Sequence, residues 1–195
     1  MSAITDPPKL PAFTLILSGV SALTEELENA LFEAGCDDAL LGIQNGSVYL
    51  DFEREADSLR NAILTAIRQV ETATVGIHVI RVEPDDVVTA AEIARRTSRS
   101  RESIRLLSSG ERGPGEFPPP VSSLMNQSSL WRWSEVAEWL VKNGLVDQSL
   151  SQNQSFGQNA VEIATLNSFL DLRRHVPTKK GILKLWSSLN PTKKR

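Results

Sequence analysis

In the first part of the chain, hydrophobic residues recur with the period of a strand in some segments and with the period of a helix in others. The apolar run at 13–18 (FTLILS) is typical of a buried strand. A helical stripe follows, with Ser21 as its predicted N-cap and Gly35 as its stop. Alternating residues on both sides of Asn45-Gly46 then predict a hairpin with a two-residue turn.

A second helical stripe at 59–70 and a strand at 75–82 complete the order β-α-β-β-α-β. Over residues 13–83 this order predicts a ferredoxin-like domain, which is an antiparallel sheet with both helices on one face. That fold serves many unrelated functions, so it does not by itself indicate an activity.

Two short helices are predicted from residue 89 onward. Thr89 and Glu92 form a capping-box pattern, in which the Thr89 hydroxyl accepts from the Glu92 N–H and the Glu92 carboxylate reaches back to Thr89. After a polar break at 97–99, Ile104 and Leu107 are spaced to pack against the first helix. The pattern therefore predicts two helices that share a small core and are joined by a tight turn.

Glycine and proline dominate residues 110–120 and exclude a helix there. The apolar residues that follow are expected to form a short hairpin or wing. Ser134 is the predicted cap of a closing helix, whose Val136 and Leu140 lie on one face. These elements define a second domain at 87–143, and the fold class predicted for the whole chain is α+β.

Charge divides the chain into an acidic part and a basic part. The net charge of the whole chain is −3. Residues 1–86 carry five basic and fifteen acidic side chains, residues 87–143 eight and six, and residues 144–195 eight and three. Phosphate would be repelled by the first part, so a nucleic acid would have to bind the other two.

Five arginines lie within residues 95–105, where Glu102 is the only acid. An arginine-rich second helix in such a pair is typical of helix-turn-helix proteins that bind DNA. The simpler alternative is a charged helix face that is only solvated, which is common in helical bundles.

Three segments in this region resemble a known DNA-binding family. They are AAEIARRTSRSRESIRLL (90–107), GEFPPPV (115–121) and LWRWSEVAEWL (130–140). Their Phe-Pro-x-Pro-Val element and their pair of tryptophans eight residues apart are similar to the small winged helix-turn-helix regulators of the AlpA and excisionase type, relatives of the MerR DNA-binding domain. Ser98 stands where that family usually has a glycine in the turn, and an insertion, ERGPGE (111–116), precedes the Phe-Pro element.

The resemblance implies a winged helix-turn-helix fold at about 88–140, with the second helix in the major groove of double-stranded DNA. The residues at the family's groove-facing positions are Ser100, Arg101, Ser103 and Arg105, and arginine reads guanine through paired hydrogen bonds. The residues expected to contact phosphates are Arg95, Arg96, Arg99, Arg112 and Arg132. Trp131 and Trp139 are assigned to the core. Because one such unit covers few base pairs, a homodimer or a cooperative array is expected.

The remaining segments flank these two domains. Residues 1–12 contain several prolines and are expected to be disordered, and the polar stretch 144–157 is expected to be a linker. A basic helical segment follows at 158–195. We expect it to pack on the DNA-binding domain or on a second subunit, with phosphate contacts from Arg173, Arg174, Lys179 and Lys180. A loosely attached tail is the alternative.

The sequence gives little support to an enzyme. His78 and His175 are the only histidines and Cys36 is the only cysteine, so we expect no catalytic triad, metal site or cofactor. No apolar run is long enough to cross a membrane, and the N-terminus lacks the pattern of a signal peptide. A cytoplasmic protein is therefore expected.

The leading hypothesis is a sequence-specific transcriptional regulator, and two alternatives remain open. An excisionase-like architectural protein would use the same contacts with DNA. An antitoxin-like interaction module would bind a partner protein through its acidic domain, residues 13–83.

Overall fold

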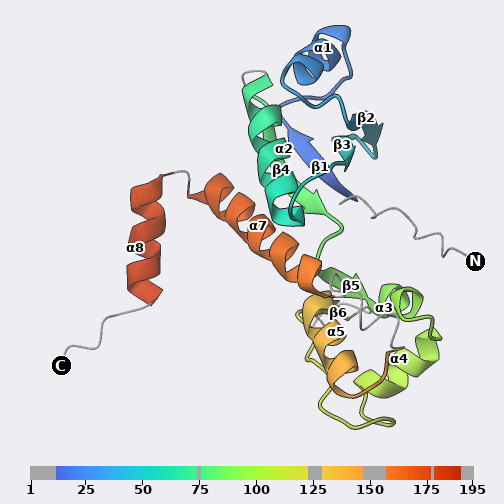
Figure 1. Ribbon diagram of the computed structural model, residues 1–195. Helices are drawn as coiled ribbons and strands as arrows, with labels where there is room; N and C mark the ends of the chain where they lie inside the picture. The colour runs from blue at the N-terminus through green and yellow to red at the C-terminus, as the bar shows by residue number, and fades with distance from the viewer. Residues whose placement is uncertain (1–11, 74–75, 123–128, 147–156, 177, 190–195) are drawn as a thin grey trace, which may run out of the picture. The chain divides into compact units, whose positions relative to one another are not determined.

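The computed structural model describes residues 12–73, 76–122, 129–146, 157–176 and 178–189 (Figure 1). Almost all of the predicted disordered N-terminus (1–12) and most of the predicted linker (144–157) lie outside these ranges. The chain is a mixed α+β protein with a small antiparallel sheet, and it divides into two compact units, residues 1–83 with 165–195 and residues 84–164.

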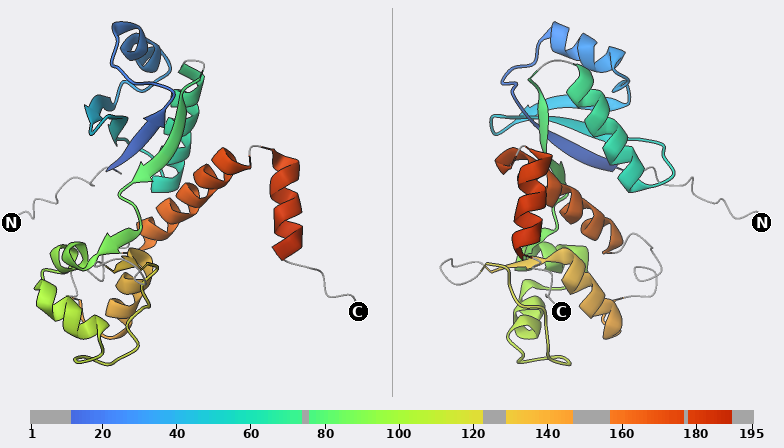
Figure 2. Two further views of the ribbon diagram at one scale, coloured as in Figure 1. Left: turned by 180° about the vertical axis from the view of Figure 1, so that it is seen from behind. Right: turned by 90° about the vertical axis from the view of Figure 1, so that its left-hand side faces the viewer.

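The first unit contains a four-stranded antiparallel sheet (Figures 1 and 2). Its elements are β1 (Ala12–Ser18), α1 (Glu25–Glu33), β2 (Ala39–Gln44), β3 (Ser47–Glu53), α2 (Leu59–Ala73) and β4 (His78–Glu83). The strands lie in the order β2-β3-β1-β4, and each neighbouring pair is antiparallel. The element order is the one that the sequence predicts.

The core of this unit follows the two hydrophobic periods of the sequence. Alternate residues of β1 and β3 are buried and cover one face of the sheet. The buried residues of α2 recur at helical spacing and complete the core: Ala62, Ile63, Ala66, Ile67 and Val70. Cys36 is also buried, and burial raises the pKa of its thiol to about 11, as expected for a structural cysteine.

The predicted cap of α1 is wrong. Thr24, rather than Ser21, caps this helix, since its hydroxyl oxygen accepts a hydrogen bond of 3.2 Å from the Leu27 N–H. A start at Thr24 places three acidic residues in the first helical turn, where the helix dipole favours negative charge. Ser21 and Leu23 therefore lie outside the helix.

The predicted hairpin between β2 and β3 is confirmed. Asn45 has φ 50° and Gly46 has φ 76°, so both turn residues are in the left-handed region that a type I′ turn requires. Gln44 and Ser47 close the turn as a pair, and the register continues without a shift to Ala39 and Phe52.

Side chains from outside the sheet cover the outer edge of β4. The Asn167 side chain, on α7 (Gln158–His175), accepts from the Val82 N–H at 2.8 Å and donates to the Val82 C=O at 2.9 Å. Val79 is bonded likewise, its N–H to Glu71 at 3.0 Å and its C=O to Arg173 at 3.0 Å. Val79 and Val82 are three residues apart, yet the backbone N–H and C=O groups of both point away from β1. A register shift opposite Ile16 and Leu17 makes this possible.

In the described residues of the second unit, a short ribbon is combined with three helices and part of a fourth. Its elements are β5 (Val87–Thr89), α3 (Ala90–Arg96), α4 (Arg101–Ser108), β6 (Leu130–Arg132), α5 (Trp133–Lys142) and the first turns of α7. β5 pairs with β6 in antiparallel register. The described residues of the predicted C-terminal segment 158–195 form two helices, α7 and α8 (Lys179–Leu189), and α7 contributes residues to both units.

None of the helices in the described part of the chain has both the length and the apolar character needed to span a membrane.

Candidate nucleic-acid interface

Caps fix both helices of the α3–α4 pair. The Thr89 hydroxyl accepts from the Glu92 N–H at 3.2 Å, and the Ser100 hydroxyl accepts from the Ser103 N–H at 3.1 Å. The Thr89 half of the predicted capping box is confirmed. The Glu92 carboxylate is engaged by Arg95 and Arg96, because two guanidinium groups offer it charge-assisted hydrogen bonds.

The turn between α3 and α4 is as tight as the sequence predicts. Ser98 has φ 52°, the left-handed conformation that glycine adopts without strain and other residues adopt at a cost. The Arg99 N–H then bonds to the Ala94 C=O at 2.9 Å, which closes the turn. Ser98 therefore holds the turn in a conformation that favours glycine.

A shared core holds the two helices together. Ile93, Ala94, Ile104 and Leu107 are buried against Val88 of the ribbon and against the apolar face of α5, as predicted. The assignment of Trp131 and Trp139 to the core is confirmed by their burial. Our prediction missed Trp133, which is buried as deeply; its position three and four residues before Val136 and Ala137 places it in the same helical stripe.

Phe117 connects the glycine- and proline-rich loop to this core. Its ring meets those of Trp131 and Trp139 edge-on, with centroids 6.1 and 5.0 Å away. The Trp139 indole donates to the Gly115 C=O at 3.1 Å. Gly113 lies so close to Leu107 that an added Cβ would approach its side chain to 2.6 Å. The loop is thus attached to the core at several points.

Where the sequence predicts a short hairpin or wing, the structure shows a short antiparallel pairing. The Val121 N–H bonds to the Leu130 C=O at 2.8 Å, and the Leu130 N–H bonds to the Ser122 C=O at 3.0 Å, so the chain is paired on both sides of residues 123–128. Residues 123–128 lie outside the described part of the chain.

Asp86 caps α5 from a distant part of the sequence. Its buried carboxylate accepts from the Ser134 N–H at 2.7 Å and from the Ser134 hydroxyl at 3.0 Å, and its C=O accepts from the Trp133 N–H. The prediction that Ser134 caps this helix is wrong, because Ser134 is its second residue and its hydroxyl donates to Asp86.

The arginines of α3 are held by one carboxylate. Arg95 and Arg96 both donate to Glu92, and these hydrogen bonds lower the pKa of Glu92 to about 2. The Arg96 side chain is only 20% exposed, and its guanidinium carbon lies 5.0 Å from the centre of the Trp133 ring. Arg95 is largely exposed and Arg96 is packed inward.

Two further arginines from the predicted set also have partners in the second unit. Arg99 donates to the Leu145 C=O at 2.5 Å, which ties the turn to the end of α5. Arg132 lies 3.7 Å from the Asp86 carboxylate, and its side chain is partly exposed. Arg99 is therefore directed toward the protein, whereas Arg132 keeps part of its surface accessible.

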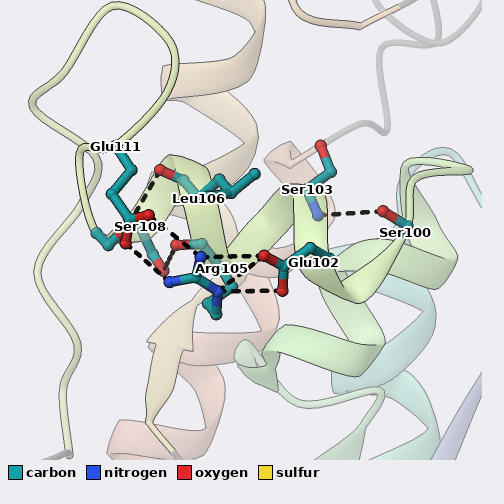
Figure 3. A network of polar contacts seen from close by, with 8 residues as sticks. Ser100, Glu102, Ser103, Arg105, Leu106, Ser108 and Glu111 are labelled. Carbon is teal, nitrogen blue, oxygen red and sulfur yellow. Dashed lines mark hydrogen bonds and ion pairs between the residues drawn. The ribbon is translucent and has the colours of Figure 1, made fainter.

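Arg105 lies between two carboxylates (Figure 3). Its Nε and Nη2 donate to Glu102, and its Nη1 and Nη2 donate to Glu111, so both edges of the guanidinium group that can form paired hydrogen bonds are occupied. The bonds to Glu111 and Glu102 raise the pKa of Arg105, and Arg105 lowers the pKa of Glu111. One arginine and two carboxylates give this cluster a net charge of −1.

Arg101 and Arg112 make no ion pair with any residue in the described ranges. Arg101 opens α4, is exposed, and lines a groove of about 380 Å³ together with Arg105, Ser108 and Trp131. Ser100 is engaged as the helix cap, and Ser103 is half-buried. Of the two arginines among the four predicted groove-facing residues, Arg105 is held by Glu102 and Glu111, and Arg101 is the one without an ion pair in the described ranges.

Comparisons of this chain with protein-family models, with curated proteins and with solved structures found no match. Within the described ranges, no three His, Cys, Asp or Glu side chains come together as a metal site would require. The candidate interface therefore depends on the geometry of the second unit.

Proposed function

We propose that this protein is a sequence-specific regulator that binds double-stranded DNA, and that its second unit is a winged helix-turn-helix domain of the AlpA and excisionase type. In this proposal α4 enters the major groove, and the pairing of residues 121–122 with Leu130 is the base of the wing. The first unit is a ferredoxin-like domain, in agreement with its element order and strand order.

One observation carries the proposal. α4 is joined to α3 by a tight turn, its apolar face is buried in the shared core, and its first residue is an exposed arginine without an ion pair in the described part of the chain. In helix-turn-helix proteins the first residues of the second helix contact base edges. Arg101 occupies this position, and a guanidinium group can donate to guanine O6 and N7 together.

The contacts divide six of the seven predicted DNA-binding arginines into three groups. Arg101 is the proposed reader of bases. Arg95, Arg112 and Arg132 keep exposed surface and are suited to phosphates, which fix position without reading sequence. Arg96 and Arg99 stabilise the fold through their internal partners.

The test requires a DNA site, which selection from a random-sequence duplex library with the full chain would supply. Arg101→Ala should weaken binding to the selected site by about 1–3 kcal/mol and should relax the preference at one base position. Arg68→Ala, which removes an exposed arginine from α2 in the acidic unit, is the matched control and should change neither quantity. Failure to select any sequence, or equal binding by the two variants, would reject the proposal.

A single domain of this kind covers few base pairs, so we expect the protein to bind as a homodimer on two half-sites. Half-site spacing in the selected sequences would be close to a multiple of one helical turn, about 10 base pairs. Sedimentation of the protein with a single half-site and with a full site distinguishes one bound chain from two.

A further inference from the structure

The two edges of the sheet in the first unit are treated differently. At β4 the outward-facing groups of Val79 and Val82 are all bonded, to Glu71, Asn167 and Arg173. Side chains thus occupy the positions that another strand would take. Natural proteins commonly protect strand edges, because an open edge is a template for pairing with another chain.

The opposite edge, β2, has a neighbouring strand on one side only among the strands that the structure describes. Because the two-residue turn makes Gln44 and Ser47 a hydrogen-bonded pair, the alternate residues Leu41 and Ile43 direct their N–H and C=O groups away from β3. β2, described in full, contains no proline, no charged residue and no register shift. The devices that usually protect an edge are therefore absent from this strand.

The core of the unit is open beside this edge. A groove of about 290 Å³ lies between α1 and β2, with Leu31, Leu41 and Leu50 among its lining residues. Phe32, also on the groove, is 66% exposed, and Leu40 on β2 is 68% exposed. A strand paired with β2 would cover apolar surface as well as satisfy backbone groups.

The charged side chains of the segment that contains this edge are all negative. Residues 10–53 contain eight acidic side chains and no lysine, arginine or histidine. Glu28 and Asp37 line the groove itself. The next cation along the chain, Arg54, is bonded to Asp38 at 2.6 Å and is buried. A second copy of the same edge would bring like charges together, which disfavours self-pairing and favours a basic partner.

We propose that the β2 edge and the adjoining groove bind an extended segment of another protein as a fifth strand, one in which apolar residues alternate with lysine or arginine. Backbone bonds to Leu41 and Ile43 provide the pairing, and the apolar residues of the partner fill the groove beside Phe32. The basic residues lie near Glu28 and Asp37. This interaction uses the first unit and is independent of the proposed binding of DNA.

The test uses synthetic octapeptides and nuclear magnetic resonance of the ¹⁵N-labelled full chain. Three peptides share alternating valine and isoleucine and differ in the intervening residue, which is lysine, glutamine or glutamate. The lysine peptide should shift the amide signals of Leu41 and Ile43, slow their exchange with solvent, and bind at least about tenfold more tightly than the glutamate peptide at low salt.

Two variants locate the site. Ile43→Lys places a positive charge on the edge and should weaken the lysine peptide by about tenfold. Phe32→Ser removes exposed apolar surface from α1 and should weaken binding of the lysine peptide. Phe169→Ser, at an exposed phenylalanine on α7, is its matched control and should leave that binding unchanged. Because Phe32 is exposed and lies outside the sheet, this variant remains informative if Ile43→Lys disturbs folding.

Three outcomes overturn the proposal. The first is the absence of binding by the lysine peptide at millimolar concentration. The second is a set of shifts centred away from residues 39–43, or equal binding of the lysine and glutamate peptides. The third is dimerisation of the free chain through this edge, because a second copy of the chain would then occupy it. Sedimentation would detect this as a dimer that Ile43→Lys converts to a monomer.

Discussion

Replacing Glu111 by glutamine should strengthen the binding of random-sequence DNA. Glu111 holds Arg105 at 2.8 Å through Nη1 and closes one edge of its guanidinium group. With Glu102 on the other edge, the cluster carries a net charge of −1 beside the proposed recognition surface. Glu111→Gln makes the cluster neutral and frees one edge of the guanidinium group for a phosphate.

The size of the effect follows from Coulomb's law. A phosphate that approaches Arg105 lies roughly 7 Å from the Glu111 carboxylate, and two unit charges at that distance in water interact by about 0.6 kcal/mol. This corresponds to a gain of about threefold in affinity at low salt, and less at physiological salt because of screening. If Arg105 then engages one additional phosphate, the plot of log affinity against log salt becomes steeper by about 0.9.

Fluorescence anisotropy with a labelled random-sequence duplex, over a series of salt concentrations, measures both quantities. Glu138→Gln makes the same charge change at an exposed position of α5 and is the matched control. Equal behaviour of the two variants would show that the Arg105 cluster does not face DNA. Weaker binding by Glu111→Gln, with an unchanged circular dichroism spectrum, would refute the reasoning, because Glu111 would then position Arg105 for contact with DNA rather than withhold it.

Three further predictions concern stability, each measured by urea denaturation. Asp86→Ala removes the cap of α5 and leaves the Ser134 N–H without its acceptor, so it should cost about 2–3 kcal/mol, and a loss below about 0.5 kcal/mol would contradict the assigned role. Glu92→Gln should cost about 1 kcal/mol at neutral pH. The pKa of Glu92 is lowered to about 2 in the folded state, so its contribution to the free energy of unfolding is complete above the unfolded pKa of about 4.5 and is lost as the pH falls toward 2. Wild type and variant should therefore have equal stability near pH 2. A difference in stability that persists there would show that it does not come from the ionised Glu92 carboxylate. Ser98→Gly relieves a left-handed residue and should stabilise the chain by about 0.5–1 kcal/mol, and destabilisation would show that Ser98 is unstrained.

Local patterns predicted the elements of both units well. The order of strands and helices in residues 13–83, the Asn45-Gly46 turn and the shared core of α3 and α4 each follow from hydrophobic period or from turn chemistry within a short window. The predicted cap of α1 is wrong because Ser21 and Thr24 are both good caps, and the acidic first turn favours Thr24.

The contacts of charged side chains were not predictable in the same way. Arginine and glutamate positions identify a basic surface, but the pairing of Arg105 with Glu111 depends on how the inserted loop returns to α4. The bond from Arg99 to the Leu145 C=O joins residues far apart in sequence, as does the cap of α5 by Asp86. The tertiary structure decides which of these distant groups become hydrogen-bond partners. No periodic pattern in the sequence marks such pairs, so they could not be predicted from it.

The cover on the β4 edge has a consequence for synthesis of the chain. Val82 and the Asn167 side chain that occupies its backbone groups are 85 residues apart. At a translation rate of about 5–20 residues per second, β4 leaves the ribosome roughly 4–17 s before its cover does. During that interval a complete β-α-β-β-α-β sequence can fold while the backbone groups of Val82 and the Val79 C=O on the β4 edge are still uncovered. The nascent sheet is therefore most exposed to mispairing with neighbouring chains on the same messenger RNA, and α7 ends that period.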